Sequence, residues 1–473
     1  MNDISEKKVS KRNMIIISVM LSGAFIAILN QTVLSPALPS IMRDLNITAS
    51  EGQWLTTAFM LVNGIMIPIT AYFIDRFTTR QIYITSMVIF TVGTTLAGFS
   101  HSFTMLMVAR IFQAIAAGIL MPLIQTVILL IFPKEKRGSA MGTVGIVVAF
   151  APAIGPTLAG SIIDSGGWNL IFKIIAPLSG IVLILAIILL KNVGETRKLK
   201  LSISSVVYST LGFGGLLYGC SCAGAYGILH PLTYVPLAVG IVFLIIFLRK
   251  QLIMKNPLLE IKLLKTPTFC YSTIIAMIIN ASLIAGTIIT PIYLQNILGF
   301  TAMQSGLVML PGAVMMGIMS PITGHLFDRF GPRFLTLLGL SLMTAGSFAF
   351  ILFDENWIFS NLCIVYTIRM FGISMILMPV NTWGLNSLDN KYMAHGSAIN
   401  NTFRQVAGSI GTALLVTIMT FFTKVASSQG AVSSTLYGMH VAFGVAAGLS
   451  AVGLILAILF VKDKKEDIDI FSN

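Results

Sequence analysis

Long apolar runs separated by short polar connections dominate this sequence. Only 10% of its 473 residues are charged, 56% are hydrophobic, and the mean hydropathy is +0.91. A soluble domain carries roughly 25% charged residues. Runs of about 20 apolar residues are long enough to cross a bilayer as helices, whereas barrel strands need only about 10 residues of alternating polarity. A helix also satisfies its own backbone polar groups in lipid. The sequence therefore predicts an all-α integral membrane protein.

The apolar runs predict fourteen membrane spans, and an even number of spans places both termini on one side. The expected ranges are 14–38, 52–73, 82–100, 104–131, 139–163, 168–190, 204–225, 232–248, 268–294, 303–326, 334–353, 357–386, 398–423 and 437–461. Trp54, Trp168 and Trp357 fall at starts of expected spans on the same side, as an interfacial aromatic belt requires.

The distribution of basic residues predicts the orientation of these spans. With the N-terminus in the cytoplasm, 24 of the 30 Lys and Arg residues fall in cytoplasmic segments, and only Arg43 and Lys424 fall in external loops. Cytoplasmic loops of membrane proteins carry such an excess of positive charge. We therefore expect both termini to be cytoplasmic. The other four basic residues lie within spans, and they are Arg110, Lys173, Arg369 and Arg404.

Composition and motifs also exclude several classes of function. The net charge of +13 does not indicate a nucleic-acid partner, because the basic residues lie in short loops rather than on one polar domain. The four cysteines lie in apolar runs, and Cys220 and Cys222 do not share a helix face, so they predict small buried hydrophobes. No phosphate-binding loop of an ATP-driven pump is present. We expect no enzyme activity, cofactor or metal.

Four pairs of markers recur along the chain at offsets of 253 to 259 residues. The pairs are Asp75 and Asp328, Arg110 and Arg369, Pro122 and Pro379, and Gly138 and Gly396. Two six-helix halves would repeat at nearer ~190 residues, and the excess is close to the length of 204–265. The sequence predicts a cytoplasmic tail at 1–13, a half at 14–190, two extra helices at 204–248, a basic connector at 249–267, a parallel-repeat half at 268–461 and a tail at 462–473.

Two connections between spans share one charged pattern. The later copy is Gly324-His325-Leu326-Phe327-Asp328-Arg329-Phe330-Gly331-Pro332-Arg333, and the earlier copy is Ala71-Tyr72-Phe73-Ile74-Asp75-Arg76-Phe77-Thr78-Thr79-Arg80. The pattern resembles the loop signature G-x-L-x-D-R-x-G-x-R of the major facilitator superfamily, where it joins the second and third helices of each half. The earlier copy has Ala71 and Thr78 where glycines are expected. The resemblance implies gating loops made of Gly324, Asp328, Arg329, Arg333, Asp75, Arg76 and Arg80.

Further stretches resemble the fourteen-helix drug:proton antiporter branch of that superfamily, which performs multidrug efflux. The first span carries Leu29-Asn30-Gln31-Thr32-Val33-Leu34-Ser35-Pro36-Ala37-Leu38-Pro39, close to L-D-x-T-V-x-x-x-A-L-P. The fifth carries the antiporter motif with alanine at two glycine positions, and its members here are Gly142, Gly155, Pro156 and Gly160. The resemblance covers essentially the whole chain. It implies a bacterial plasma membrane exporter.

The resemblance and the charge pattern together suggest roles for the gating loops and for the motif in the fifth span. Asp328 and Asp75 are expected to pair with a basic residue or with helix N-terminal amides in one conformational state only, and so to stabilise the outward-open state. The alternative is that they are fixed loop charges that hold the topology. In the fifth span, the small residues allow close helix approach and the prolines favour a bend; pure packing is the alternative.

Basic and amide side chains within the spans are candidates for coupling and for lining a substrate cavity. Arg110 with Gln113 matches the superfamily's span-4 R-x-x-Q pattern, which implies a role in proton coupling, and Arg369 is its repeat partner. Arg404 and Lys173 either face a cavity or extend to the interface. The expected cavity residues are Asn30, Gln31, Gln113, Gln125, Asn381 and Asn386.

The sequence departs from its branch at one position that matters for the mechanism. Asn30 stands where the branch has an aspartate, and no expected span contains a carboxylate at mid-depth. If protons drive transport, the carrier is one of the acids or histidines nearer the loops: Asp75, Asp328, Glu51, Asp164, His325 or His440. A cavity without a deep acid favours neutral or anionic amphiphiles over cationic drugs.

The first expected function is a proton-coupled exporter of amphiphilic drug-like compounds. The alternative is an exporter of an endogenous anionic metabolite, such as a cyclic dinucleotide or a lipid precursor. A sensor or scaffold is a third class, but its expected soluble output domain is absent from this sequence. We expect the partners to be a small amphiphilic substrate, protons and the lipid bilayer, and the protein to be a monomer.

Overall fold

The computed structural model describes residues 11–197, 200–227, 229–354, 357–428 and 434–462. Most of the two expected tails, 1–10 and 463–473, lies outside these ranges, as does Lys198 of the expected basic loops. In the part of the chain that the structure describes, all regular elements are helices, and fourteen are long and apolar enough to cross a membrane. The prediction of an all-α protein with fourteen spans is confirmed.

The helices follow one another with short connections. Their bounds are α1 (Lys11–Thr32), α2 (Leu34–Asp44), α3 (Ala49–Arg76), α4 (Thr79–Gly98), α5 (Phe103–Ile131), η1 (Lys134–Lys136), α6 (Arg137–Gly166), α7 (Trp168–Leu189), α8 (Ile203–Tyr226), α9 (Pro231–Ile253), η2 (Ile261–Lys265), α10 (Pro267–Asn296), α11 (Ala302–Phe330), α12 (Pro332–Ala349), η3 (Phe350–Leu352), α13 (Phe359–Asn386), η4 (Asn390–Tyr392), α14 (Met393–Ser428) and α15 (Ser434–Phe460).

Two helices have bounds that differ from the expected spans. The expected span 14–38 is divided, because α1 ends at Thr32 and the short helix α2 follows. A proline ring clashes with the carbonyl four residues earlier, and for Pro36 that residue is Thr32. The expected span 398–423 begins five residues earlier, since α14 starts at Met393. This extra turn carries His395, which lies at a contact between helices described below.

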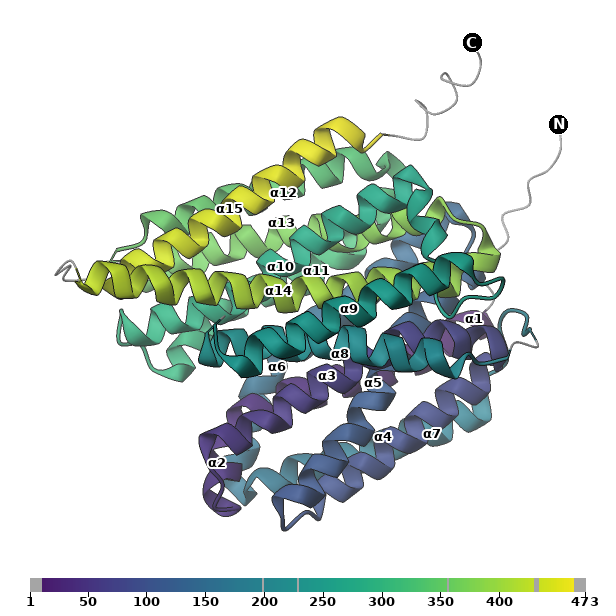
Figure 1. Ribbon diagram of the computed structural model, residues 1–473, viewed down its shortest axis with the longest axis horizontal. Helices are drawn as coiled ribbons and strands as arrows, with labels where there is room; N and C mark the ends of the chain where they lie inside the picture. The colour runs from purple at the N-terminus through teal and green to yellow at the C-terminus, as the bar shows by residue number, and fades with distance from the viewer. Residues whose placement is uncertain (1–10, 198–199, 228, 355–356, 429–433, 463–473) are drawn as a thin grey trace.

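Successive long helices run in opposite directions, so that both ends of the described chain lie on one side of the bundle. Figure 1 shows the start of α1 and the end of α15 towards the same end of the bundle, with α2 at the other. We call these the termini side and the far side. The connections α3–α4, α5–α6, α11–α12 and α13–α14 lie on the termini side.

Two groups of helices pack against each other, with a helical hairpin alongside. In Figure 1, α1 and α3–α7 lie in the lower part and α10–α15 in the upper part. The groups meet where α6 packs on α11 and where α14 packs on α3 and α5. The hairpin α8–α9 lies between them in this view, and α8 contacts both α3 and α14.

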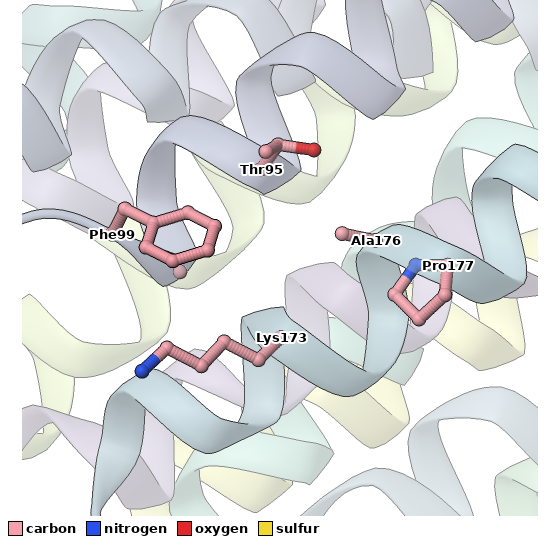
Figure 2. A pocket seen from close by; sticks show the side chains of 6 residues that line it. Thr95, Phe99, Lys173, Ala176 and Pro177 are labelled. Carbon is pink, nitrogen blue, oxygen red and sulfur yellow. The ribbon is translucent and has the colours of Figure 1, made fainter.

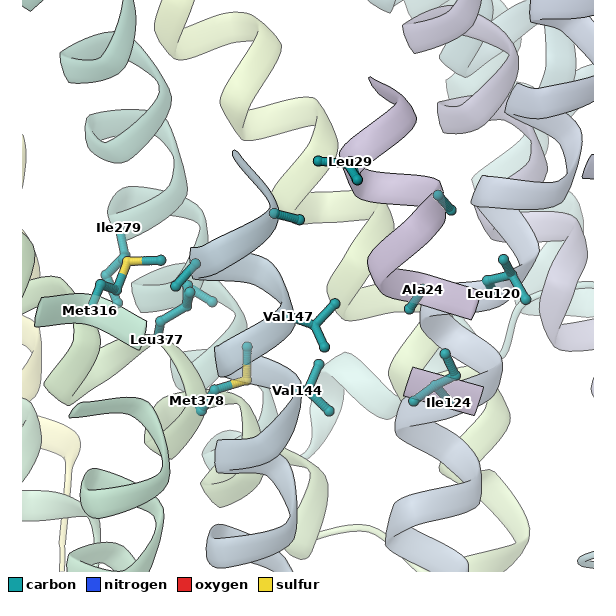
Figure 3. Packing of buried hydrophobic residues seen from close by; sticks show 14 of the residues in the cluster. Ala24, Leu29, Leu120, Ile124, Val144, Val147, Ile279, Met316, Leu377 and Met378 are labelled. Atoms are coloured by element: carbon teal, nitrogen blue, oxygen red, sulfur yellow. The ribbon is translucent and has the colours of Figure 1, made fainter. Parts of the chain in front are cut away.

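The apolar core continues from one group into the other. Figure 3 shows Val144 and Val147 of α6, with α1 and α5 on one side and Leu377 and Met378 of α13 on the other. All of these side chains are buried. Because α6 belongs to the first group and α13 to the second, this packing fixes how the two groups meet and therefore which polar residues face each other.

Candidate functional site

Asp328 in the last turn of α11 contacts the first turn of α6. The main-chain N–H groups of Gly138 and Ser139 donate to its two carboxylate oxygens, each at 2.8 Å. The Ser139 hydroxyl donates to the same carboxylate. The first N–H groups of a helix have no partners within the helix and carry the positive end of its dipole, so they favour an anion. The negative charge of Asp328 thus joins the two helix groups.

Two glycines allow this close approach. A Cβ atom on Gly138 would lie 2.5 Å from Oδ1 of Asp328, and one on Gly324 would lie 2.4 Å from the carbonyl oxygen of Gly138. Real Cβ atoms are not found at such distances. The glycine at 324 in the loop signature is therefore explained by helix contact, since any side chain there would push α11 away from α6.

A second polar contact joins α6 to the other group. Arg137, which is almost fully buried, donates to the Oδ1 atoms of Asn386 at 3.1 Å and Asn390 at 2.9 Å. Its Nε atom donates to the carbonyl of Phe132 at 3.2 Å. Asn386 was expected to line a substrate cavity. The structure instead places it at the termini-side end of α13, where it is a partner of Arg137.

Asp75 in the last turn of α3 meets the first turn of α14. Its Oδ2 atom lies 3.2 Å from Nε2 of His395, and both side chains are nearly buried, with exposed fractions of 12% and 10%. The main-chain carbonyl of Asp75 accepts a hydrogen bond from the N–H of Arg197 at 2.7 Å. This contact is the repeat counterpart of the Asp328 contact, since His395 precedes Gly396 as Arg137 precedes Gly138.

The basic residues of the two loops have local roles. The guanidinium groups of Arg76 and Arg329 lie over the rings of Phe77 and Phe330, at 5.8 and 5.1 Å. Arg80 donates to the carbonyl of Ile187 at 2.7 Å and so ties α4 to the end of α7. Arg333 lies partly exposed in the first turn of α12. Asp328 and Asp75 thus join the two helix groups, whereas Arg76, Arg80 and Arg329 contact residues of their own group.

The contact between α6 and α11 extends about halfway along α6. Beyond Gly138 it continues at Gly142, where a Cβ atom would lie 2.7 Å from the carbonyl oxygen of Ser320. It reaches Gly317, where a Cβ atom would lie 2.3 Å from the ring of Phe150. Farther along, Pro156 is exposed and nothing lies within 4 Å of a Cβ atom at Gly160. The contact between α6 and α11 is therefore confined to the termini-side half of α6 in the described residues.

The four residues of the antiporter motif consequently lie in different surroundings. Gly142 contacts α11, whereas Gly155 contacts α1, where a Cβ atom would lie 2.3 Å from Oγ1 of Thr32. Pro156 and Gly160 make no such contact. The helix continues without interruption from Arg137 to Gly166 through both internal prolines.

Arg110 is fully buried within the first helix group. It donates to the main-chain carbonyl of Asn30 at 3.4 Å and to Oε1 of Gln113 at 2.8 Å, and its guanidinium lies 4.2 Å from the centre of the Phe59 ring. Gln113 in turn donates to Thr94 at 3.2 Å. Arg110 and Gln113 therefore brace α5 against α1, α3 and α4, away from the contact between the groups.

Arg369 occupies the corresponding place in the second group. It donates to the main-chain carbonyl of Ser282 in α10 at 2.6 Å and to the Ser347 hydroxyl in α12 at 3.3 Å. A Cβ atom at Gly286 or Gly346 would lie within 3 Å of its side chain. The expected repeat pairing of Arg110 and Arg369 is thus visible in their contacts, because each donates to the first long helix of its own group.

Arg404 differs from these two arginines, because its side chain is partly exposed and its guanidinium donates no hydrogen bond among the described residues. Nε of Arg110 and Nη1 of Arg369 are also buried without partners, but other nitrogens of those two groups do donate. Arg404 lies eleven residues into α14, about 16 Å from the start of the helix at ~1.5 Å per residue. The main-chain carbonyl of Arg404 accepts a hydrogen bond from Asn280 at 2.7 Å, but its Nε atom is buried without a partner among the described residues. The guanidinium of Arg404 is therefore available for a partner that is not part of the described chain.

The remaining amides expected in a cavity also lie in different surroundings. Oε1 of Gln125 accepts from Nδ2 of Asn401 at 2.7 Å, which adds a contact between α5 and α14. Both side-chain polar atoms of Asn30, and Oδ1 of Asn381, are buried and have no hydrogen-bond partner among the described residues. Gln31 is partly exposed. Asn30 and Asn381 thus retain unused hydrogen-bonding capacity deep in the protein.

Lys173 lies on the outer surface and not between the two groups. Figure 2 shows it with Thr95, Phe99, Ala176 and Pro177 around a shallow groove of about 450 Å³ between α4 and α7. Its ammonium nitrogen lies 5.5 Å from the centre of the Phe99 ring. Neighbouring side chains such as Ile174 and Leu178 are exposed. Lys173 therefore extends along the lipid-facing surface towards the interface.

Sequence reasoning missed the partners of the two loop acids. The repeat pairs Gly138 with Gly396, but it does not identify the neighbouring residues Arg137, Ser139 and His395 as contacts. The repeat contained the missing signal, since the segments 137–141 and 395–399 each begin a helix that follows a termini-side connection. Asp75 and Asp328 lie at the ends of helices, and 137–141 and 395–399 begin helices on the same side. This placement predicts that each acid contacts the start of one of these helices.

The comparisons with known proteins agree with this arrangement. Residues 20–412 match the family model of the Major Facilitator Superfamily. The chain is 47% identical over 465 residues to the uncharacterized MFS-type transporter YcnB of Bacillus subtilis (strain 168), with 98% of each chain covered. It is 41% identical over 416 residues to the lincomycin resistance protein LmrB of the same organism, with 86% of this chain and 85% of LmrB covered.

The human organic anion transporter MFSD10 (TETRAN) has the same fold. The two structures superpose with a TM-score of 0.67 at 12% sequence identity, and 94% of this chain and 99% of that chain are covered. Fourteen candidate spans in the described residues, inward-facing arginines at equivalent places in two helix groups and the matched family model agree with one another. The chain belongs to the major facilitator superfamily and is a multi-pass membrane transporter, not an enzyme.

Proposed function

We propose that this transporter exports amphiphilic, drug-like compounds from a bacterial cell by proton-coupled alternating access, with both termini in the cytoplasm. The single observation that carries the proposal is the closed termini side, where Asp75 of the first helix group and Asp328 of the second each contact the start of a helix in the opposite group. In the proposed orientation, this arrangement is the outward-open state. The name of the relative LmrB supports a substrate of the antibiotic class.

The two acids act in this proposal as conformational latches. Their partners belong to the opposite helix group, so the contacts exist only while the termini side is closed. A contact that is present in one state and absent in the other shifts the equilibrium by its own free energy. Hydrogen bonds to a charged group contribute roughly 1.5–3 kcal/mol each. The latches therefore favour the closed termini side until substrate or protons favour the opposite state.

Arg404 is the proposed contact for the substrate. The guanidinium groups of Arg110 and Arg369 donate to main-chain carbonyls within their own groups, whereas the guanidinium of Arg404 donates no hydrogen bond among the described residues. Arg404 lies about 16 Å along α14, whose 36 residues extend about 54 Å, so it lies in the termini-side half of this span. A cation without a hydrogen-bond partner within a membrane span is costly, and an anionic or strongly accepting substrate would offset that cost. This chemistry favours neutral or anionic amphiphiles.

Transport in proteoliposomes tests the proposal. Molecules inserted inside-out should accumulate an anionic amphiphile when the vesicle interior is acidic, and accumulation should stop when the pH gradient is collapsed. Arg404→Gln should lower the initial rate for the anionic compound about tenfold, the effect of losing ~1.4 kcal/mol of binding. Arg404→Lys should restore part of the rate, because it keeps the charge.

The control variant is Lys173→Gln, which removes a span lysine that faces the lipid and should leave transport unchanged. A lipophilic cation serves as the second substrate, and Asn30→Asp should increase its transport by adding a buried acid. If wild type pumps the cation well and neither Asn30→Asp nor Arg404→Gln has any effect, the proposed substrate contact is wrong. Transport of a cyclic dinucleotide or lipid precursor in preference to drug-like compounds would favour the export of an endogenous metabolite.

A further inference from the structure

The segments that flank the hairpin α8–α9 touch both partners of the Asp75–His395 contact. Before the hairpin, the N–H of Arg197 donates to the main-chain carbonyl of Asp75 at 2.7 Å. After the hairpin, the N–H of Glu260 donates to Nδ1 of His395 at 3.2 Å. Asp75 belongs to the first helix group and His395 to the second. The hairpin is therefore connected to the two groups at the place where they meet.

Gln251 in the last turn of α9 holds the second of these segments in place. It is fully buried, and its Oε1 atom accepts from the N–H groups of Leu258 at 2.6 Å and Leu259 at 3.3 Å. Its Nε2 atom donates to the hydroxyl of Ser205 in α8 at 3.1 Å. One side chain thus fixes the chain just before Glu260 against both helices of the hairpin.

His395 uses both ring nitrogens in this arrangement. Its Nδ1 atom accepts from Glu260, so the proton of the neutral ring resides on Nε2, which donates to Asp75. The space enclosed by Tyr72, Asp75, Lys200, Asn256 and His395 is about 10 Å³, room for about one water molecule at most. The contact between the flanking segments and the two helix groups is therefore tight and directional.

We propose that the α8–α9 hairpin is a strap that holds the termini side closed, with Gln251 and His395 as its positioning residues. Opening this side separates Asp75 from His395, because they lie on opposite groups. A strap bound to both must then release one of them, so its hydrogen bonds oppose opening. The inference rests on the proposed gating function of Asp75. It assigns to the two extra helices of this chain an energetic role in alternating access.

Hydrogen–deuterium exchange of the full-length protein in lipid nanodiscs tests the strap without any transport measurement. Gln251→Leu removes the hydrogen bonds that hold residues 258–259 and places an apolar side chain of similar size there. We expect amide exchange to become at least threefold faster in residues 254–262, and also in 73–77 and 393–399. These last two segments belong to the two helix groups and are not touched by Gln251.

Thr233→Val is the matched control. Thr233 is fully buried in the same hairpin, near the other end of α9, and its hydroxyl has no hydrogen-bond partner among the described residues. This variant should leave exchange in 73–77 and 393–399 at the wild-type rate. Faster exchange confined to 254–262 in Gln251→Leu would overturn the proposal, because Gln251 would then have only a local structural role.

Two variants of His395 distinguish its contact with Glu260 from its contact with Asp75. His395→Asn keeps an acceptor near Nδ1 for the N–H of Glu260 but loses the donor to Asp75, so exchange should rise in 73–77 while 254–262 stays protected. His395→Gln keeps a donor in the place of Nε2 and should give the reverse pattern. If both variants change exchange in 73–77 and 254–262 in the same way, His395 does not connect these two segments as proposed. These experiments measure exchange and not transport. Their outcome therefore tests the strap even if the proposed substrate of the transporter is wrong.

Discussion

Arg137 and Asn386 form a hydrogen bond of 3.1 Å across the two helix groups, from the first turn of α6 to the last residue of α13. The same guanidinium donates to Asn390 and to the carbonyl of Phe132, so its planar fork connects three segments on the termini side. Together with the contacts of Asp328 and Asp75, it closes this side by polar groups that lie at helix ends.

Arg137→Lys should weaken the closed termini side even though it conserves the charge. A lysine ammonium cannot reproduce the fork that reaches Asn386, Asn390 and Phe132 together. The reporter is a cysteine at Val144, which is fully buried behind the contact, in a background without the four native cysteines. A membrane-impermeant thiol reagent applied from the termini side should label it about fivefold faster or more, as a loss of ~1 kcal/mol requires.

Arg76→Lys is the control for this variant, since Arg76 is exposed and lies over Phe77. It should leave the labelling rate unchanged. Equal labelling of the Arg137→Lys variant and wild type would show that the fork geometry contributes nothing to closure.

Asp328→Asn should open the termini side by removing the negative charge from the start of α6. The neutral amide keeps one acceptor oxygen but loses the charge-assisted bonds to Gly138 and Ser139. We expect the Val144→Cys reporter to be labelled about tenfold faster, which corresponds to ~1.4 kcal/mol. Transport should fall in parallel while the amount of inserted protein stays the same.

Asp389→Asn serves as the matched control, because Asp389 is 73% exposed and pairs only with the surface residue Lys391 in the described chain. Exposed ion pairs contribute about 0–1 kcal/mol. Full transport and unchanged labelling in Asp328→Asn would favour the alternative in which the loop acids only hold the topology.

Two glycines of the antiporter motif should differ in their tolerance of a methyl group. Gly142→Ala would place a Cβ atom 2.7 Å from the carbonyl oxygen of Ser320, whereas Gly160→Ala meets nothing within 4 Å. Overpacking of this kind costs about 1–3 kcal/mol. Because the clash exists only while α6 and α11 are in contact, Gly142→Ala should increase reporter labelling and reduce transport. Gly160→Ala should have the properties of wild type, and a similar loss in both variants would refute the assignment.

Arg110→Lys and Arg369→Lys should lower the thermal stability of the purified protein by similar amounts. Each arginine braces one helix group through a main-chain carbonyl and a side chain that a lysine cannot reach together, at Asn30 and Gln113 or at Ser282 and Ser347. Losing hydrogen bonds of a charged group costs roughly 1.5–3 kcal/mol. Aggregation temperature in detergent measures the effect. Lys173→Gln should not change it, and a decrease as large there would mean that burial of the arginines is not the cause.

The gating loops illustrate what could be read from local sequence and what could not. Asp75 and Asp328 stand out because they are acids between long apolar runs, and their repeat offset predicts equivalent places in two halves. Their partners were not identified, because Gly138, Ser139 and His395 offer backbone N–H groups and one neutral ring rather than an obvious countercharge. Asn386 was expected in a cavity because polar residues are rare in spans, but its helix end places it beside Arg137.

The sequence by itself determined three features of this protein. These are its fourteen apolar helices, the repeat that pairs Arg110 with Arg369, and an asparagine instead of an acid at position 30. These follow from the length of apolar runs, the cost of exposed backbone in lipid and the spacing of markers along one chain, all of which are local properties. The tertiary structure alone decided that the start of α6 faces Asp328, that the segment after the hairpin α8–α9 reaches His395, and that the guanidinium of Arg404 has no hydrogen-bond partner among the described residues. Those relationships join residues up to 320 positions apart, and they depend on how two helix groups pack, which no local pattern specifies.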